Sequence, residues 1–223
     1  MSFKFATLVG CSAGALAGAA FAQVEAQWSE APSVAEMAAL YPAKAKAAGV
    51  GGAVDLTCDV RDGRPHDCAV LKETPSGYGF GFAARKAGER MRVGDPGLNG
   101  KEVRIPVTFD PSVLKGDVVV TKPVWAAMPN ATDFQLTFPK AENGVNNVRV
   151  VLACTVAQGG ALSDCSVAQE EPAGQGYGAG ALALAPKFRV GPWSQDGQPT
   201  VGGKLRLPIR YALTPAKPDA AKP

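Results

Sequence analysis

The sequence predicts an α+β protein made of two tandem small domains. Three observations lead to this fold class: a long run of residues that occurs twice, alternating apolar residues typical of strands in each copy, and a helical apolar spacing after them. The chain has 223 residues, of which 46% are hydrophobic and 19% charged, so it is too apolar for intrinsic disorder. Its formal net charge is only +3 and no basic run stands out, which argues against nucleic acid as a partner.

The internal repeat defines the expected domains. The spacing of Trp28, Pro32 and Tyr41-Pro42 is repeated by Trp125, Pro129 and Phe138-Pro139, and Arg92-Val93-Gly94 is repeated by Arg189-Val190-Gly191. The second copy carries a five-residue insertion around Gln195 to Thr200. We therefore expect domains at 28–109 and 125–211, a linker at 110–124 in which Asp117 to Thr121 forms a short strand, and a disordered Ala/Lys/Pro tail at 212–223.

The first residues resemble an export signal. Phe5 to Ala22 is an apolar stretch that ends in Ala20-Phe21-Ala22, the small-x-small pattern accepted by signal peptidase. We expect residues 1–22 to be a cleaved signal peptide and the mature protein to be periplasmic. Two alternatives remain: an uncleaved N-terminal membrane anchor, and lipid attachment at Cys11, which follows Leu8-Val9-Gly10 in the manner of a lipobox.

The four cysteines of the mature chain fall into two local pairs. Export to an oxidising compartment favours disulfides, so we expect Cys58 to bond to Cys68 and Cys154 to bond to Cys165. A zinc site built from all four thiolates is the alternative. Nine and ten residues intervene within the pairs, whereas zinc sites favour two to four.

Each copy is expected to contain a helix, a β-hairpin, a second helix and an edge strand. Val54, Leu56, Cys58 and Val60 alternate with polar residues, which is typical of a strand with one buried face. If the paired cysteines stand opposite each other, the hairpin loops are Asp62 to Arg64 and Gln158 to Ala161. The corresponding strand of the second copy carries Val148, Val150, Leu152, Cys154 and Val156.

A second helix and a final strand follow each hairpin. Helical spacing on one face relates Phe80, Ala84, Ala87 and Met91 in the first copy, and Tyr177, Ala181, Leu184 and Phe188 in the second. The final strands carry Pro106 and Pro208. Because proline lacks an amide hydrogen, it is tolerated at a sheet edge and not at its centre. We therefore expect both final strands to be edges.

This order of motifs resembles the TonB C-terminal domain family. The resemblance rests on Tyr41-Pro42, the glycines at Gly49 and Gly52, the hairpin with Asp62-Gly63, the Ala83-Ala84 helix and the strand Val103 to Phe109. It covers most of 32–109 and, more loosely, 129–211. The second copy departs from the pattern at Asn143 to Asn147, where we expect a shorter first helix.

The resemblance implies a binding function. Domains of that family bind outer-membrane receptors, and a short receptor segment adds as a strand beside the last strand of the domain. A strong membrane anchor and a Pro-rich spacer are not evident before the first domain, which argues against a full energy transducer. We therefore expect protein binding in the envelope, and a relation to TonB-dependent transport stays open. The resemblance implies that the binding residues lie on the final strands. They are Val103, Arg104, Ile105 and Val107 in the first copy, and Leu205, Arg206, Leu207 and Ile209 in the second.

Enzymatic chemistry is not expected. The chain has a single histidine, His66, which rules out multi-histidine metal sites and which we interpret as a solvent-facing strand residue. We expect no catalytic residues, no metal and no cofactor. The alternative to receptor binding is a structural envelope protein whose domains associate with each other, and an enzyme with a polar cleft ranks third. Trp28 and Trp125 are interpreted as core anchors rather than ligand-stacking groups.

Overall fold

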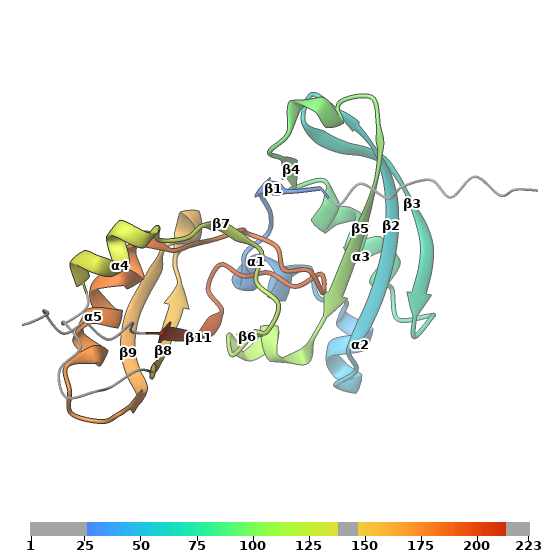
Figure 1. The fold of residues 1–223 in the computed structure, drawn as a ribbon. Coiled ribbons are helices and arrows are strands. Elements are labelled where there is room, and N and C mark those ends of the chain that lie inside the picture. Colours follow the sequence, from blue (N-terminus) through green and yellow to red (C-terminus); the bar gives the residue numbers. More distant parts are fainter. Residues whose placement is uncertain (1–25, 138–146, 213–223) are drawn as a thin grey trace, which may run out of the picture.

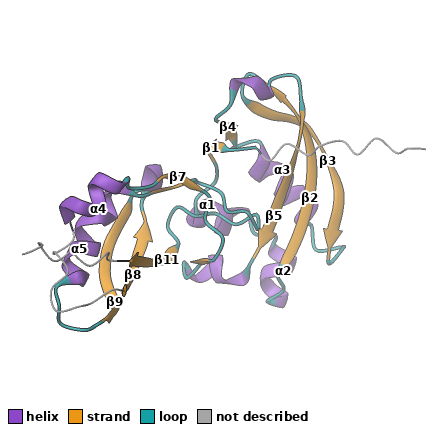
Figure 2. Cartoon of the chain, viewed as in Figure 1, coloured by secondary structure: helices purple, strands orange, loops and turns teal. Residues whose placement is uncertain are grey.

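The computed structural model describes residues 26–137 and 147–212 and shows a mixed α+β fold (Figures 1 and 2). The expected signal peptide at 1–22, the lipid-attachment alternative at Cys11, the tail from 213 onward and the segment at Asn143 to Asn146 lie outside the described residues. Within the described ranges, buried hydrophobic side chains form two clusters, each packed beneath its own sheet.

The first cluster lies under a three-stranded antiparallel sheet in the order β3-β2-β5. Helix α3 packs on one face of this sheet, and the other face carries polar residues such as Asp55 and Arg104. The small strands β1 and β4 pair beside it. The elements are β1 (Trp28–Glu30), α1 (Val34–Leu40), α2 (Ala43–Ala48), β2 (Gly52–Arg61), β3 (Arg64–Thr74), α3 (Phe80–Gly88), β4 (Arg92–Val93), the 3₁₀ turn η1 (Pro96–Leu98) and β5 (Glu102–Phe109).

The second cluster lies under a four-stranded sheet in the order β6-β11-β8-β9. The connection from β5 contains η2 (Pro111–Lys115) and β6 (Val119–Val120), so the short strand expected within Asp117 to Thr121 is present. The remaining elements are β7 (Trp125–Ala127), α4 (Ala131–Thr137), β8 (Asn147–Val156), η3 (Gln158–Gly160), β9 (Leu162–Glu171), α5 (Tyr177–Leu184), η4 (Ala185–Lys187), β10 (Arg189–Val190) and β11 (Lys204–Ala212).

The predicted apolar faces are the buried ones. On β2 the alternating residues Val54, Leu56, Cys58 and Val60 are at most 2% exposed. The helical face is buried in the same way, because each of its apolar members points toward the sheet. Those members are Phe80, Ala84, Ala87 and Met91 on and after α3, and Tyr177, Ala181, Leu184 and Phe188 on and after α5.

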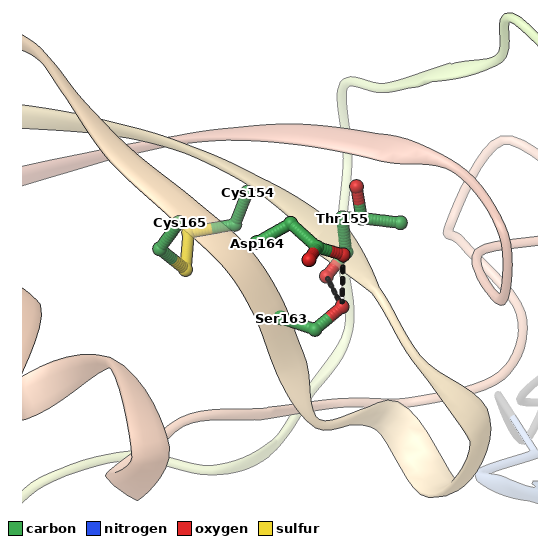
Figure 3. The surroundings of a disulfide bond; sticks show 5 residues. All are labelled: Cys154, Thr155, Ser163, Asp164 and Cys165. Carbon is green, nitrogen blue, oxygen red and sulfur yellow. Dashed lines mark hydrogen bonds between the residues drawn. A yellow bond between two sulfur atoms is a disulfide. The ribbon is translucent and has the colours of Figure 1, made fainter.

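Both predicted disulfides are present. Cys58 is bonded to Cys68 and Cys154 to Cys165, each pair with its Cα atoms 4.1 Å apart. In both hairpins the second cysteine directly follows an aspartate with positive φ, which is Asp67 in the first hairpin and Asp164 in the second. This aspartate and the cysteine after it together lie opposite a single residue of the neighbouring strand, the first cysteine of the pair. This is a β-bulge. Figure 3 shows the second disulfide, with the Ser163 hydroxyl donating to the Thr155 carbonyl and the Asp164 carboxylate beside it.

Because of the bulge, the first hairpin turn is shorter than predicted. Asp62 and Gly63 alone form the first turn, with φ of 51° and 72°, and Arg64 already pairs with Arg61. The predicted three-residue loop was one residue too long because the extra residue is absorbed at Asp67 rather than at the tip. In the second hairpin the loop contains the expected Gln158 to Ala161, and Ala157 closes it by donating to the Ala161 carbonyl.

The two clusters are joined by more than the chain connection. Trp193, which lies between β10 and β11, is 2% exposed and belongs to the first cluster rather than the second. The amide of Val34 at the start of α1 donates to the Val201 carbonyl at 2.9 Å. The segment before β11 therefore packs against the first sheet and α1 (Figure 1). Residues after position 125 in the sequence, such as Trp193, therefore pack in the cluster formed by residues before it.

Removing either disulfide is expected to destabilise the protein by about 3 kcal/mol, because each bond closes a loop with a sequence separation of 10 or 11 residues in the unfolded chain. Urea unfolding of a Cys58→Ala/Cys68→Ala variant, with the second disulfide intact, measures this loss. An unchanged unfolding midpoint would show that the bond contributes nothing to stability.

Glu36 is expected to stabilise α1 only above mildly acidic pH. The Ser33 backbone amide, and then its hydroxyl, donate to the Glu36 carboxylate and hold its pKa below the ordinary 4.5. A carboxyl whose pKa is lower in the folded state stabilises above its unfolded pKa, and that stabilisation disappears as pH falls through the folded pKa. Glu36→Gln should therefore lower the melting temperature at neutral pH and have no effect in acid, whereas the exposed control Glu102→Gln should have little effect at either pH.

Candidate functional site: the outer edges of the final strands

The direction of the backbone groups defines the outer edge of β5. The Thr108 amide donates to the Gly197 carbonyl at 2.7 Å, on the side away from β2. Backbone groups of an antiparallel strand alternate in direction, so those of Glu102, Arg104 and Pro106 point the same way. The missing amide hydrogen of Pro106 thus faces outward, as expected for an edge strand, and β5 is the edge of its sheet.

The C-terminal part of the β5 edge is covered from within the chain. Residues 193–199, hereafter the capping turn, form a tight turn in which Trp193 pairs with Pro199 and the Ser194 amide donates to the Gln198 carbonyl. The Trp193 ring N–H donates to the Pro106 carbonyl at 3.0 Å, and the Thr108 hydroxyl donates to the Asp196 carbonyl at 2.7 Å. The capping turn therefore satisfies the outward carbonyl of Pro106 and the outward amide of Thr108.

A glycine permits this close approach. Gly197 has a φ of +76°, and a Cβ atom at this position would lie 2.5 Å from the Pro106 carbonyl oxygen. The turn is also tied to the linker, since the Gln195 amide donates to the Lys122 carbonyl and the Thr121 hydroxyl donates to the Asp196 carboxylate. The outward backbone groups of Glu102 and Arg104 have no hydrogen-bond partner among the described residues.

The edge of β11 is covered at the opposite end. Strand β6 pairs in parallel with β11 at Lys204 and Leu205, and the Lys204 amide donates to the Val118 carbonyl. The expectation that β11 is an edge along its whole length is therefore wrong: its first two residues lie inside a four-stranded sheet. Beyond this pairing, the same alternation directs the backbone groups of Pro208 and Arg210 outward, and no described strand lies beside them.

An apolar hollow of about 430 Å³ adjoins the open part of β11. The rings of Trp125 and Phe188 lie 5.4 Å apart on one side of it, and Met128, which is 65% exposed, lies at its rim. The strand itself supplies Leu205, Arg206, Leu207 and Pro208 to the lining. A segment lying along β11 would thus find hydrogen-bonding groups and an apolar pocket side by side.

The two edges differ in charge. On β5 the Arg104 guanidinium is paired with the Asp55 carboxylate at 2.7 Å, and Asp55 lies opposite Pro106. On β11 the residue opposite Pro208 is Val151, so the corresponding carboxylate is missing. Arg206 and Arg210 are exposed and form no ion pair with any described residue. The open edge of β11 is therefore positively charged.

The structure places the eight predicted binding residues in two groups. Arg104 and Arg206 are exposed beside the outward backbone groups. The other six side chains are at most 5% exposed and pack in the cores. Of these six, only Leu205 and Leu207 line the hollow, where a bound segment could contact them. These six are Val103, Ile105, Val107, Leu205, Leu207 and Ile209.

Sequence reasoning missed Met128, Phe188 and the capping turn as parts of this region. A sequence signal for the turn was present, because Gln195 to Thr200 is where the expected second repeat carries an insertion relative to the first. Trp28 packs against the first core as expected, and Trp125 packs on Phe188 while also lining the hollow. His66 is exposed on β3.

Within 26–137 and 147–212, no group of acidic, histidine or cysteine residues is arranged to hold a metal ion. The helices in these ranges are also too short or too polar to span a bilayer. The two disulfides indicate an oxidising, extracytoplasmic environment. Comparison of the chain with protein-family models and with curated proteins finds no match.

Replacing Gly197 is expected to lift the capping turn from β5. In Gly197→Ala the new Cβ clashes with the Pro106 carbonyl, so the Thr108 amide should exchange its hydrogen at least roughly tenfold faster. Gly159→Ala is the matched control, because Gly159 has a similar φ of +70° with nothing within 4 Å of the added Cβ. Equal exchange of Thr108 in both variants would mean that the contact does not protect this edge.

Proposed function

We propose that this chain is an exported protein-binding module made of two copies of a TonB C-terminal-like domain, and that it engages other envelope proteins by strand addition. The open, outward-facing edge of β11 beside an apolar hollow is the observation that carries this proposal. Strand addition needs unpaired main-chain groups for affinity and a nearby pocket for specificity.

Matched structural details support the duplication. The amide of Phe80 at the start of α3 donates to the Glu73 carboxylate at 3.0 Å, and the amide of Tyr177 at the start of α5 donates to the Glu170 carboxylate at 2.9 Å. Each carboxylate lies at a helix N-terminus, where negative charge is stabilising. Both hairpins also carry an aspartate bulge directly before the second cysteine.

The extracytoplasmic environment indicated by the disulfides is consistent with envelope partners. We propose that the leading segment directs export and that the final strands carry the binding function. Of the two, β11 is the principal docking edge, because the capping turn already occupies Pro106 and Thr108 on β5. Whether such binding serves TonB-dependent transport depends on the partner that docks.

Blocking the outward amide of Arg210 tests strand addition. Arg210→Pro removes that donor while leaving the ladder with β8 intact, since Arg210 directs its amide away from β8; Pro208 already shows that the strand accepts proline. We expect the yield of partners captured from envelope extract by the immobilised mature protein to fall roughly fivefold or more, as one hydrogen bond is worth about 1 kcal/mol. Quantitative mass spectrometry of the captured proteins measures the change.

Arg210→Gln is the matched control, because it removes the charge and keeps the amide. Equal capture by Arg210→Pro and Arg210→Gln, with equal melting temperatures, would overturn strand addition at this edge. Light scattering of the purified protein checks the structural alternative: self-association that Arg210→Pro abolishes would mean that the edge pairs with a second copy. Charged substitutions at Ile105 or Leu207 do not serve as tests, since both side chains are buried.

A further inference from the structure

The capping turn shows what kind of group the final strands accept. On β5 the outward carbonyl of Pro106 is occupied by an indole N–H, and the indole ring that donates it is almost completely buried. Pro208 occupies the corresponding place on β11, opposite Val151 as Pro106 is opposite Asp55. Pro208 lines the hollow together with Trp125, Met128 and Phe188.

We infer that the β11 edge binds an extended, acidic peptide segment of another protein through a tryptophan side chain that enters this hollow and donates its ring N–H to the Pro208 carbonyl. The inference rests on the proposed function and names the class of partner. The tryptophan of the guest takes the place at β11 that Trp193 takes at β5.

The positive charge of the site indicates which residues should flank the tryptophan in the bound peptide. Arg206 and Arg210 flank Pro208 on the solvent face of β11, and no carboxylate among the described residues lies within ion-pair distance of either. On β5 the internal Asp55 neutralises Arg104. At β11 that negative charge is left for the guest to supply, so aspartate or glutamate on either side of the tryptophan complements the edge.

The hollow is suited to a large aromatic ring. Trp125 and Phe188 form a tilted aromatic pair along one wall, and Leu207 of the strand contributes to the lining. Aromatic rings pair favourably at such centroid distances, and the burial of a large ring contributes more than any other single side chain. Met128 at the rim is flexible and polarizable, so it can pack over the entering ring.

A fluorescently labelled synthetic peptide with one tryptophan between acidic residues provides the test, with binding to the mature protein followed by anisotropy. Changing the tryptophan to phenylalanine should weaken binding roughly fivefold through loss of the N–H bond, and changing it to alanine should weaken binding roughly tenfold to hundredfold. Lysines in place of the acidic residues should abolish the binding seen at low salt.

Variants of the protein locate the site. Met128→Glu places a carboxylate at the rim of the hollow and should weaken binding of the acidic peptide at least roughly tenfold. Leu136→Glu is the matched control, because Leu136 is 80% exposed on α4 and does not line the hollow. Equal affinity for the tryptophan and alanine peptides, or equal effects of the two protein variants, would overturn the inference.

The two proposals fail in different ways. If the tryptophan peptide binds and Met128→Glu abolishes binding while Arg210→Pro does not, the hollow takes an aromatic group without strand addition, and the proposed function falls. If Arg210→Pro abolishes capture of envelope partners while Met128→Glu does not, strand addition stands and the tryptophan inference falls.

Discussion

A strand at the rim of a sheet directs half of its amide and carbonyl groups away from the sheet, and these groups must find partners or water. In this protein the requirement applies to the outer strands β3, β5, β6 and β9 and also to the part of the final strand β11 that β6 does not cover. Pro106 and Pro208 reduce it by one donor each, which is why the sequence can place proline there. On β5 the capping turn meets the outward Pro106 carbonyl and Thr108 amide, and on β11 strand β6 meets the outward groups only at the first residues.

Small differences between the two halves make the edges unequal. The insertion near Gln195 supplies the turn that covers β5, and it acts on the first sheet although it belongs to the second half of the sequence. Asp55 neutralises Arg104, whereas Val151 leaves Arg206 unpaired. The open part of one edge is therefore neutralised within the chain, and the open part of the other is basic and next to an apolar hollow.

The alternation of β2 and the helical spacing of α3 could be predicted from the sequence, because each is a local pattern with a period fixed by backbone geometry. The cysteine pairs could be predicted because the two partners lie only 10 or 11 residues apart in the sequence. The hairpin turn was one residue off, since a bulge at Asp67 and a longer loop satisfy the same cysteine spacing. The insertion marks the residues of the capping turn, but the edge that this turn covers and the pairing of β6 with β11 could not be predicted. They join residues far apart in the sequence, and no periodicity records which edge a turn will cover.

Partial coverage of both edges has a physical advantage. A long, bare and apolar edge strand pairs readily with other copies of itself, and proteins limit this by shortening or charging such edges. Here the capping turn shortens one edge, while β6, Pro208 and two unpaired arginines limit the other. Because like charges repel, the arginines oppose pairing of β11 with a second β11, yet they favour an acidic guest. The charges that oppose pairing of this edge with itself are thus also the ones that would favour an acidic partner.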